Sequence, residues 1–255
     1  MVVSQWMRSS GKLHLLALCV GLFAVSYTTV QAASTHIGTD QAIKKTAKPD
    51  SIQPKRANFE GESKSQDAQN FADWVVDSRD NGGLSFVIID KIDARVFVFS
   101  ADGHIRGAAP ALLGLAKGDD SVPGIGTRKL ANIRPEERTT PAGRFVASLG
   151  HNAKGKDILW IDYNGALSLH RVIPVKARLE RLATPTPLDN RMSYGCINVP
   201  TKFYENIVNP AFKETHGIVY ILPESRSKNE IFTSYYDVGS PPKQHQALTQ
   251  QGSQK

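Results

Sequence analysis

The chain has 255 residues, which is enough for one domain of ordinary size together with tails. Its formal charge is +7, and no lysine- or arginine-rich block carries interleaved aromatic residues, so a nucleic-acid-binding function is not expected. A mild positive charge suits an anionic polymer such as a cell wall.

The first 32 residues have the anatomy of a secretory signal peptide. Arg8 and Lys12 precede the almost wholly apolar run 13–25, and Val30-Gln31-Ala32 offers small residues before a cleavage point. The apolar run is short for a membrane span. We therefore expect cleavage after residue 32 rather than a retained anchor, no membrane span in the mature chain, and a periplasmic or secreted location.

Removal of the signal peptide takes away Cys19 and leaves Cys196 as the single cysteine. One cysteine cannot form an internal disulfide, although export delivers the chain to a compartment where disulfides form. A lone thiol there is either buried and inert or kept for its reactivity. The local sequence has to decide between these two interpretations.

Composition divides the mature chain into three parts. Residues 33–70 are rich in Lys, Ser, Gln, Asp and Ala, which predicts a disordered linker. Residues 71–83 begin with an apolar stretch and predict a short helix, whereas the polar, Gln-rich residues 224–255 predict a disordered tail. Between these parts, residues 84–223 form one apolar-rich domain.

Within this domain, short runs of β-branched and aromatic residues predict strands. The runs 85–90 and 95–99 flank a turn and predict a hairpin, and Asn164-Gly165 predicts a second hairpin. Many short strands and few helices favour a mostly β sandwich or barrel. The remaining predicted strands are 105–113, 144–149, 158–163, 166–172 and 217–222, and the predicted short helices are 175–182 and 201–208.

The tetrapeptide Ser193-Tyr194-Gly195-Cys196 has parts that a cysteine nucleophile needs. A glycine permits a turn that a side chain would forbid, so the amides of Gly195 and Cys196 could point at one place and hold an oxyanion. The alternative is a small buried cysteine that follows a glycine in a strand. The tetrapeptide alone does not decide between them.

A histidine in the predicted strand 166–172 is the candidate base. Alternation places Ala166, Ser168 and His170 on one face, and strand pairing could bring His170 close to Cys196 and its thiol proton. The alternative is a strand histidine satisfied by a backbone carbonyl. One cysteine and scattered histidines give no ligand spacing for a metal, so we expect neither a metal nor a cofactor.

Four stretches, in this order, resemble the catalytic domain of the L,D-transpeptidases, the YkuD-type fold. Residues 86–99 resemble its opening hairpin, Thr139–Phe145 its Thr-Pro-x-Gly-x-Phe segment, Leu167–His170 the strand that carries the base, and Ser193–Asn198 its Ser-His-Gly-Cys-hydrophobic-Asn/Arg signature. The resemblance covers the whole predicted domain. It implies a mostly β, YkuD-like sandwich or barrel with one or two short helices, to which this chain adds a long loop insertion before the cysteine.

The resemblance also implies a role for each matching residue. Cys196 would be the nucleophile and His170 the general base, with the backbone carbonyl of Arg171 orienting the imidazole ring. The amides of Gly195 and Cys196 would form the oxyanion hole. The residues that would hold the site or the peptide are Ser193, Tyr194 and Asn198.

The implied reaction is acyl transfer on peptidoglycan stem peptides, without metal or cofactor. Cys196 would attack the L-to-D peptide bond of a tetrapeptide, release the terminal D-alanine and pass the acyl group from a thioester to an amine. Water in place of the amine would make the protein a carboxypeptidase. The open alternatives are an amidase or hydrolase of the same fold, a related enzyme with a substrate outside peptidoglycan, and a non-catalytic wall-binding module.

Two features depart from the family's pattern. Tyr194 stands where the signature has histidine, and residues 174–190 form an insertion before the cysteine. This insertion would be either a lid over the site or a solvated surface loop. A second excursion, residues 114–138, is rich in glycine and charge, and both segments could reshape donor or acceptor specificity.

Overall fold

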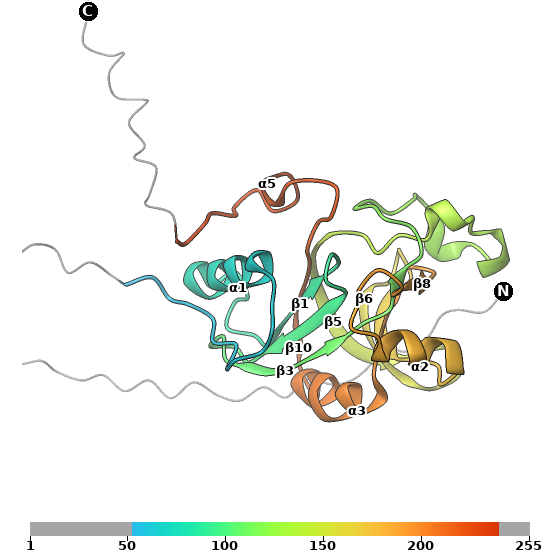
Figure 1. Ribbon diagram of the computed structural model, residues 1–255, viewed down its shortest axis with the longest axis horizontal. Coiled ribbons are helices and arrows are strands. Elements are labelled where there is room, and N and C mark those ends of the chain that lie inside the picture. The colour runs from blue at the N-terminus through green and yellow to red at the C-terminus, as the bar shows by residue number, and fades with distance from the viewer. Residues whose placement is uncertain (1–52, 240–255) are drawn as a thin grey trace, which may run out of the picture. The chain divides into compact units, whose positions relative to one another are not determined.

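The computed structural model describes residues 53–239, whose centre is one eight-stranded sheet (Figure 1). The sheet order is β3-β2-β1-β10-β5-β6-β7-β9, and β4 pairs with β8 in a separate ribbon. The expectation of a mostly β fold is confirmed. The strands are β1 (Phe86–Asp90), β2 (Arg95–Phe99), β3 (Ile105–Pro110), β4 (Leu113–Gly114), β5 (Gly143–His151), β6 (Asp157–Asp162), β7 (Leu167–Arg171), β8 (Arg191–Ser193), β9 (Ile197–Val199) and β10 (His216–Ile221).

Both predicted hairpins are present. Strands β1 and β2 pair in antiparallel orientation, as do β6 and β7 across the Asn164-Gly165 turn. The helical elements are more numerous than expected. They are α1 (Gln66–Ser78), α2 (Lys176–Ala183), α3 (Thr201–Phe203), the π-helical η4 (Tyr204–Val208), α4 (Asn209–Phe212), α5 (Lys228–Ile231) and the 3-10 turns η1 (Ile125–Thr127), η2 (Leu130–Asn132) and η3 (Pro135–Glu137).

Alternation along the strands sends apolar side chains to two separate cores. The inner face of the sheet, which carries Leu159, Leu169 and Ile197, packs on the helical stretch 201–212. The outer face, which carries Phe97 and Tyr220, is covered at one end by α1. Figure 1 shows α1 and α3 on opposite sides of the sheet. His170 alternates with Leu169 and therefore belongs to the outer face.

The ordered domain extends beyond the predicted 84–223 at its N-terminal side. Helix α1 begins at Gln66, where the Ser65 hydroxyl accepts a hydrogen bond from the Ala68 amide at 3.0 Å. Further upstream, the buried ring of Phe59 packs edge-on against Phe97, with 5.4 Å between the ring centroids. The linker assignment is thereby corrected from about residue 57 onward, because these apolar side chains bury themselves on the sheet.

The expected C-terminal tail needs a similar correction. Phe232 is buried, and the ring of Tyr235 stacks on that of Phe71 of α1 at 5.5 Å with a 7° interplanar angle. Residues 224–239 thus complete the core under α1. The predicted signal peptide, the predicted linker up to residue 52 and residues 240–255 lie outside the described residues.

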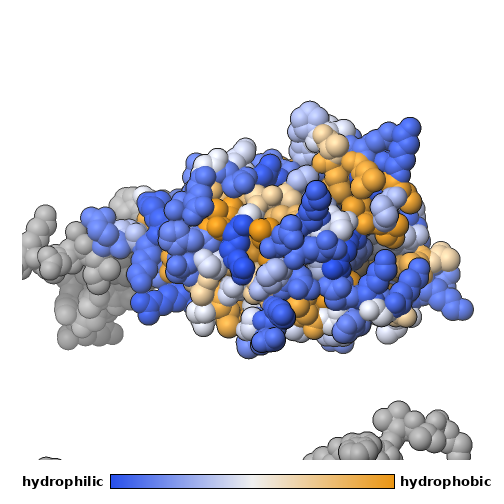
Figure 2. All heavy atoms as spheres, turned by 90° about the horizontal axis from the view of Figure 1, so that it is seen from below, coloured by the Kyte–Doolittle hydropathy of each residue, from blue (hydrophilic) through white to orange (hydrophobic). Residues whose placement is uncertain are grey.

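On the face drawn in Figure 2, hydrophilic residues are interspersed with separate patches of exposed hydrophobic residues. Between residues 53 and 239, no helix combines the length and the apolar character that crossing a membrane requires.

Candidate active site

Parallel pairing of β7 with β9 brings the predicted nucleophile to the predicted base. Leu169 is paired with Ile197, so Cys196, directly before β9, lies beside the outer-face residues of β7. The Ser168 hydroxyl donates to Cys196 Sγ at 3.5 Å, and His170 lies near enough to the thiol for each side chain to shift the pKa of the other. His170 and Cys196 therefore lie next to each other across adjacent strands, and their assignment as base and nucleophile stays a prediction. The thiol is free and half-buried.

The two nitrogens of His170 have separate partners. Nδ1 lies 2.8 Å from the backbone carbonyl oxygen of Arg171. Because a carbonyl only accepts hydrogen bonds, Nδ1 carries a proton and Nε2 is left for Cys196. The sequence left two interpretations of His170 open, a general base and a strand histidine bonded to a backbone carbonyl. In the structure, one ring nitrogen is bonded to a carbonyl and the other is left available.

Arg171 is itself held firmly at the end of β7. Its guanidinium contacts Asp157 Oδ1 at 3.0 Å and Glu205 Oε1 at 3.0 Å, and it lies over the Tyr204 ring at 4.3 Å. These contacts tie β7 to β6 and to the helical stretch below the sheet. They therefore fix the carbonyl that orients the imidazole.

The pKa values of Cys196 and His170 shift in opposite directions, and each shift favours the charged form of its side chain. Burial alone would raise the pKa of the Cys196 thiol, but interactions with His170 and Ser168 outweigh it and lower that pKa below the ordinary thiol value. Burial would lower the pKa of His170, but its hydrogen bond and charge interaction with Cys196 raise it above 6.5. Thiolate and imidazolium thus stabilise each other, as a reactive cysteine requires.

A glycine is needed directly before the cysteine. Gly195 has φ of +128°, and a Cβ there would lie 2.6 Å from the Thr139 carbonyl oxygen. From the other side, the Thr140 hydroxyl donates to the Gly195 carbonyl at 2.7 Å and accepts from the Gly114 amide at 2.9 Å. The Thr139-Thr140 segment therefore supports the cysteine turn, a function that sequence reasoning missed.

The two amides expected to form an oxyanion hole differ in whether they already donate a hydrogen bond. The Gly195 amide donates to the Ser193 hydroxyl at 3.0 Å, and Ser193 is buried. Among residues 53–239, no acceptor is seen for the Cys196 amide. The Cys196 amide is thus available to a substrate oxygen as it stands, whereas the Gly195 amide becomes available only when the Ser193 hydroxyl turns away.

Asn198 supports the site from below and does not face solvent. It is 1% exposed, its Nδ2 donates to the Cys196 carbonyl at 3.0 Å, and its Oδ1 accepts from Arg178 Nη1 at 2.7 Å. Arg178 belongs to α2, so the 174–190 insertion is anchored behind the cysteine. Of the two expected functions for Asn198, holding the site or the peptide, the structure shows the first.

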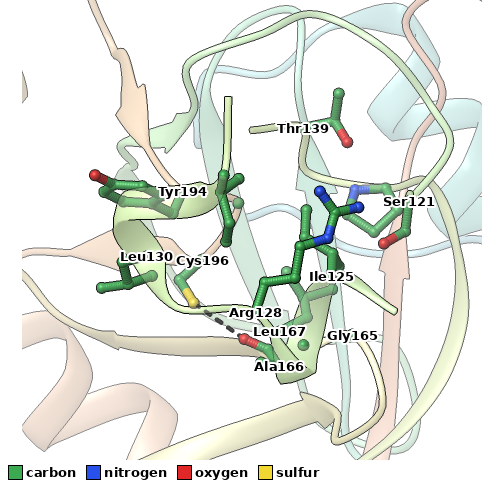
Figure 3. A pocket seen from close by; sticks show the side chains of 14 residues that line it. Ser121, Ile125, Arg128, Leu130, Thr139, Gly165, Ala166, Leu167, Tyr194 and Cys196 are labelled. Carbon is green, nitrogen blue, oxygen red and sulfur yellow. Dashed lines mark hydrogen bonds between the residues drawn. The ribbon is translucent and has the colours of Figure 1, made fainter. Parts of the chain in front are cut away.

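A pocket of about 160 Å³ opens beside the thiol. Figure 3 shows the Cys196 sulfur facing the Ala166 carbonyl at its edge, with Tyr194 and Leu130 on one side and Arg128 on the other. The lining residues are Ser121, Ile125, Gly126, Arg128, Leu130, Ile133, Thr139, Pro141, Gly165, Ala166, Leu167, Tyr194, Gly195 and Cys196.

The 114–138 excursion supplies much of this wall, whereas no residue of 174–190 lines the pocket. At Gly126 the excursion approaches the β6–β7 turn so closely that a Cβ would lie 2.2 Å from the Asn164 carbonyl oxygen. Tyr194, which replaces the signature histidine, lies under the Arg138 guanidinium at 4.1 Å. The tyrosine therefore lines the pocket, and among residues 53–239 it is His170 whose charge affects the thiol pKa.

A buried cluster of four charges stands behind Thr140. The Lys91 ammonium donates to the Thr140 carbonyl at 2.9 Å and to Asp119 at 2.6 Å, and both side chains are 0% exposed. Glu224 lies 3.6 Å from the same ammonium and is paired with Arg191. Two cations and two anions cancel, so the buried cluster is neutral. It connects the 114–138 excursion and the C-terminal segment to the cysteine turn.

Asp119 is ionised in this cluster. Burial would raise its pKa, but hydrogen bonds from Lys91, from the Ser225 hydroxyl and from the amides of Glu224 and Ser225 hold that pKa well below its usual range. For Lys91, burial lowers the pKa, and the hydrogen bond to Asp119 opposes the shift. No local pattern in the sequence predicts this cluster, because Lys91 falls in a predicted turn.

Comparison with known proteins finds similarity in solved structures alone. No protein-family profile and no curated protein sequence matches the chain. The helical cell shape determining protein Pgp2 from Campylobacter jejuni matches with 16% identity and a TM-score of 0.36, over 56% of this chain and 49% of Pgp2. The chain thus spans about half the length of that protein.

Two L,D-transpeptidases are also matched. The catalytic domain from E. faecium has 18% identity and a TM-score of 0.31, over 54% of this chain and 96% of the domain. The enzyme from Xylanimonas cellulosilytica has 15% identity and a TM-score of 0.33, over 55% of this chain and 60% of that one. These overlaps are partial, and the chemistry proposed below follows from the side chains of the site.

Proposed function

We propose that the protein is an exported cysteine acyltransferase that acts on peptidoglycan stem peptides through a thioester on Cys196. One observation carries the proposal. The imidazole of His170 has its Nδ1 held by the Arg171 carbonyl at 2.8 Å, and it lies across adjacent strands from a half-buried thiol whose pKa it lowers and which borders an open pocket. A buried, inert cysteine needs none of these partners.

The residues divide the reaction in a simple way. The Cys196 thiolate attacks the carbonyl of the L-to-D peptide bond, and the Cys196 amide donates to the oxygen that becomes negative. The His170 imidazolium gives its proton to the departing D-alanine nitrogen. Neutral His170 then takes a proton from the incoming amine, which attacks the thioester and releases the thiolate.

The pocket suits a peptide substrate. Its apolar side chains, such as Ile125 and Leu130, offer contact area, while the guanidinium of Arg128 offers a charge next to it. Arg128 is already paired with Glu137 at 3.0 Å, which fixes its position and reduces its attraction for other anions. An L,D-carboxypeptidase uses the same residues with water as the acceptor, so the two activities differ only in what enters after the thioester forms.

Turnover of a disaccharide-tetrapeptide by the purified protein is the direct test. We expect a crosslinked dimer, or a tripeptide if water accepts, and we expect neither product from Cys196→Ala. Mass spectrometry of the products distinguishes the outcomes. If the folded wild-type protein leaves the substrate unchanged, the peptidoglycan proposal fails, and wall binding or a different substrate takes its place.

A further inference from the structure

Two stacked aromatic rings form an exposed platform on the outer face of the sheet. The rings of Trp160 on β6 and Tyr163 in the following turn lie 4.5 Å apart with an interplanar angle of 22°. Tyr163 is 67% exposed and Trp160 is half-buried. Neither ring belongs to the hydrophobic cores, so packing of the fold does not explain the pair.

The neighbouring strand is shaped to let the indole lie against it. A Cβ at Gly150 of β5 would be 2.7 Å from Trp160 Cδ1 and 3.2 Å from the Tyr163 hydroxyl oxygen. The backbone of Gly150 does not have positive φ, so glycine serves here to make room. In the described chain no acceptor contacts Trp160 Nε1, which leaves one donor free beside the rings. Ser148, directly opposite Trp160 in the register, adds an exposed hydroxyl.

The platform lies at a defined distance from the thiol. Trp160 is opposite Ser168 on β7, and Ser168 in turn contacts Cys196 Sγ. Two strand spacings separate Trp160 from Cys196, which is roughly 10 Å. On the side of the platform towards α1, Val146 of β5 is 61% exposed.

We propose that the Trp160–Tyr163 platform binds a sugar ring of the wall glycan whose stem peptide occupies the active site. The C–H face of a pyranose is apolar and matches the electron-rich face of an aromatic ring, while its hydroxyls match the free indole N–H and the Ser148 hydroxyl. Distance supports this occupant. Three extended residues span about 10 Å, so a tetrapeptide with its third carbonyl at Cys196 that runs towards β6 can reach the platform with its sugar end.

This assignment deepens the proposed function and rests on it, but sugar binding is measurable without turnover. The probe is a tetrasaccharide of N-acetylglucosamine, added to the Cys196→Ala protein. We expect it to shift the Trp160 indole N–H signal in NMR and to leave that of Trp74 unchanged, because Trp74 is buried and donates to the Ser234 carbonyl. Tyr163→Ala should weaken binding about five- to tenfold.

The kinetic test compares substrates with and without sugar. Tyr163→Ala should raise KM for the disaccharide-tetrapeptide about five- to tenfold and leave turnover of the free tetrapeptide unchanged. Tyr236→Ala, which removes another exposed tyrosine, is the matched control and should change neither. Gly150→Ala should reproduce the Tyr163→Ala effect by displacing the indole.

The outcomes separate the two proposals. A Trp160 signal that the tetrasaccharide does not shift, or binding that Tyr163→Ala leaves intact, overturns the sugar platform even if tetrapeptides are turned over. Binding that depends on Tyr163, in a protein that turns over neither substrate, supports the platform and removes the acyltransferase.

Discussion

Replacing His170 with alanine is expected to slow acyl transfer about 10²- to 10⁴-fold, the range of a lost general base. The variant loses the imidazole, which both accepts the proton and lowers the Cys196 pKa, so the half-buried thiol becomes harder to ionise. Transfer rates with disaccharide-tetrapeptide measure the first effect. Alkylation of Cys196 by iodoacetamide near pH 7, which should also slow, measures the second.

His216→Ala is the matched control, since His216 is an exposed histidine at the start of β10. It should retain the wild-type rates of both reactions. Wild-type transfer by folded His170→Ala would show that another group accepts the proton, and the assigned mechanism would have to be abandoned.

Lys91→Met is expected to lower the free energy of unfolding by about 3 kcal/mol, because breaking a buried ion pair leaves an uncompensated charge. The Asp119 carboxylate would lose its cation and keep the amides and the Ser225 hydroxyl that hold it now. These remaining donors place the expected loss at the lower end of the usual range. Urea denaturation followed by circular dichroism measures it.

Lys154→Met provides the comparison for Lys91→Met, since Lys154 is exposed and the same charge is removed. It should change stability by less than about 0.5 kcal/mol. Lys91→Met should also slow Cys196 alkylation, because the Thr140 carbonyl loses the ammonium that donates to it, while the Thr140 hydroxyl supports Gly195. Equal stability of the two variants would contradict the expected loss of the buried ion pair. An unchanged alkylation rate in Lys91→Met would mean that the buried cluster does not hold the cysteine turn.

The sequence predicted the parts of the fold whose signals are local. Two apolar runs around a turn gave the 86–99 hairpin, and Asn164-Gly165 gave the next one. The first turn of helix α1 falls in the predicted linker because Gln66–Asn70 are mostly polar, although Ser65 and the apolar residues at 68, 71, 72 and 75 carry a helix signature. Strand β9 was missed because three residues show no period, and its pairing partner lies far along the chain.

In the site, too, local patterns were predictable and contacts between distant segments were not. Alternation placed Ser168 and His170 on one face, and the thiol was found on that face. Which strand would lie beside Cys196 could not be read from the chain, since parallel pairing is set by the whole sheet. The support by Thr140, the anchor between Arg178 and Asn198, and the buried Lys91 depend on tertiary contacts that no local pattern encodes.

The central claim is that Cys196 and His170 act as one thiolate–imidazolium pair. Its most direct test is the rate of Cys196 alkylation as a function of pH in the folded wild-type protein. Since the Cys196 pKa is lowered by His170 and Ser168, the rate should rise and level off at a pH below the ordinary thiol value of about 8.5. Alkylation that begins only around that value, or only after unfolding, would contradict the pair.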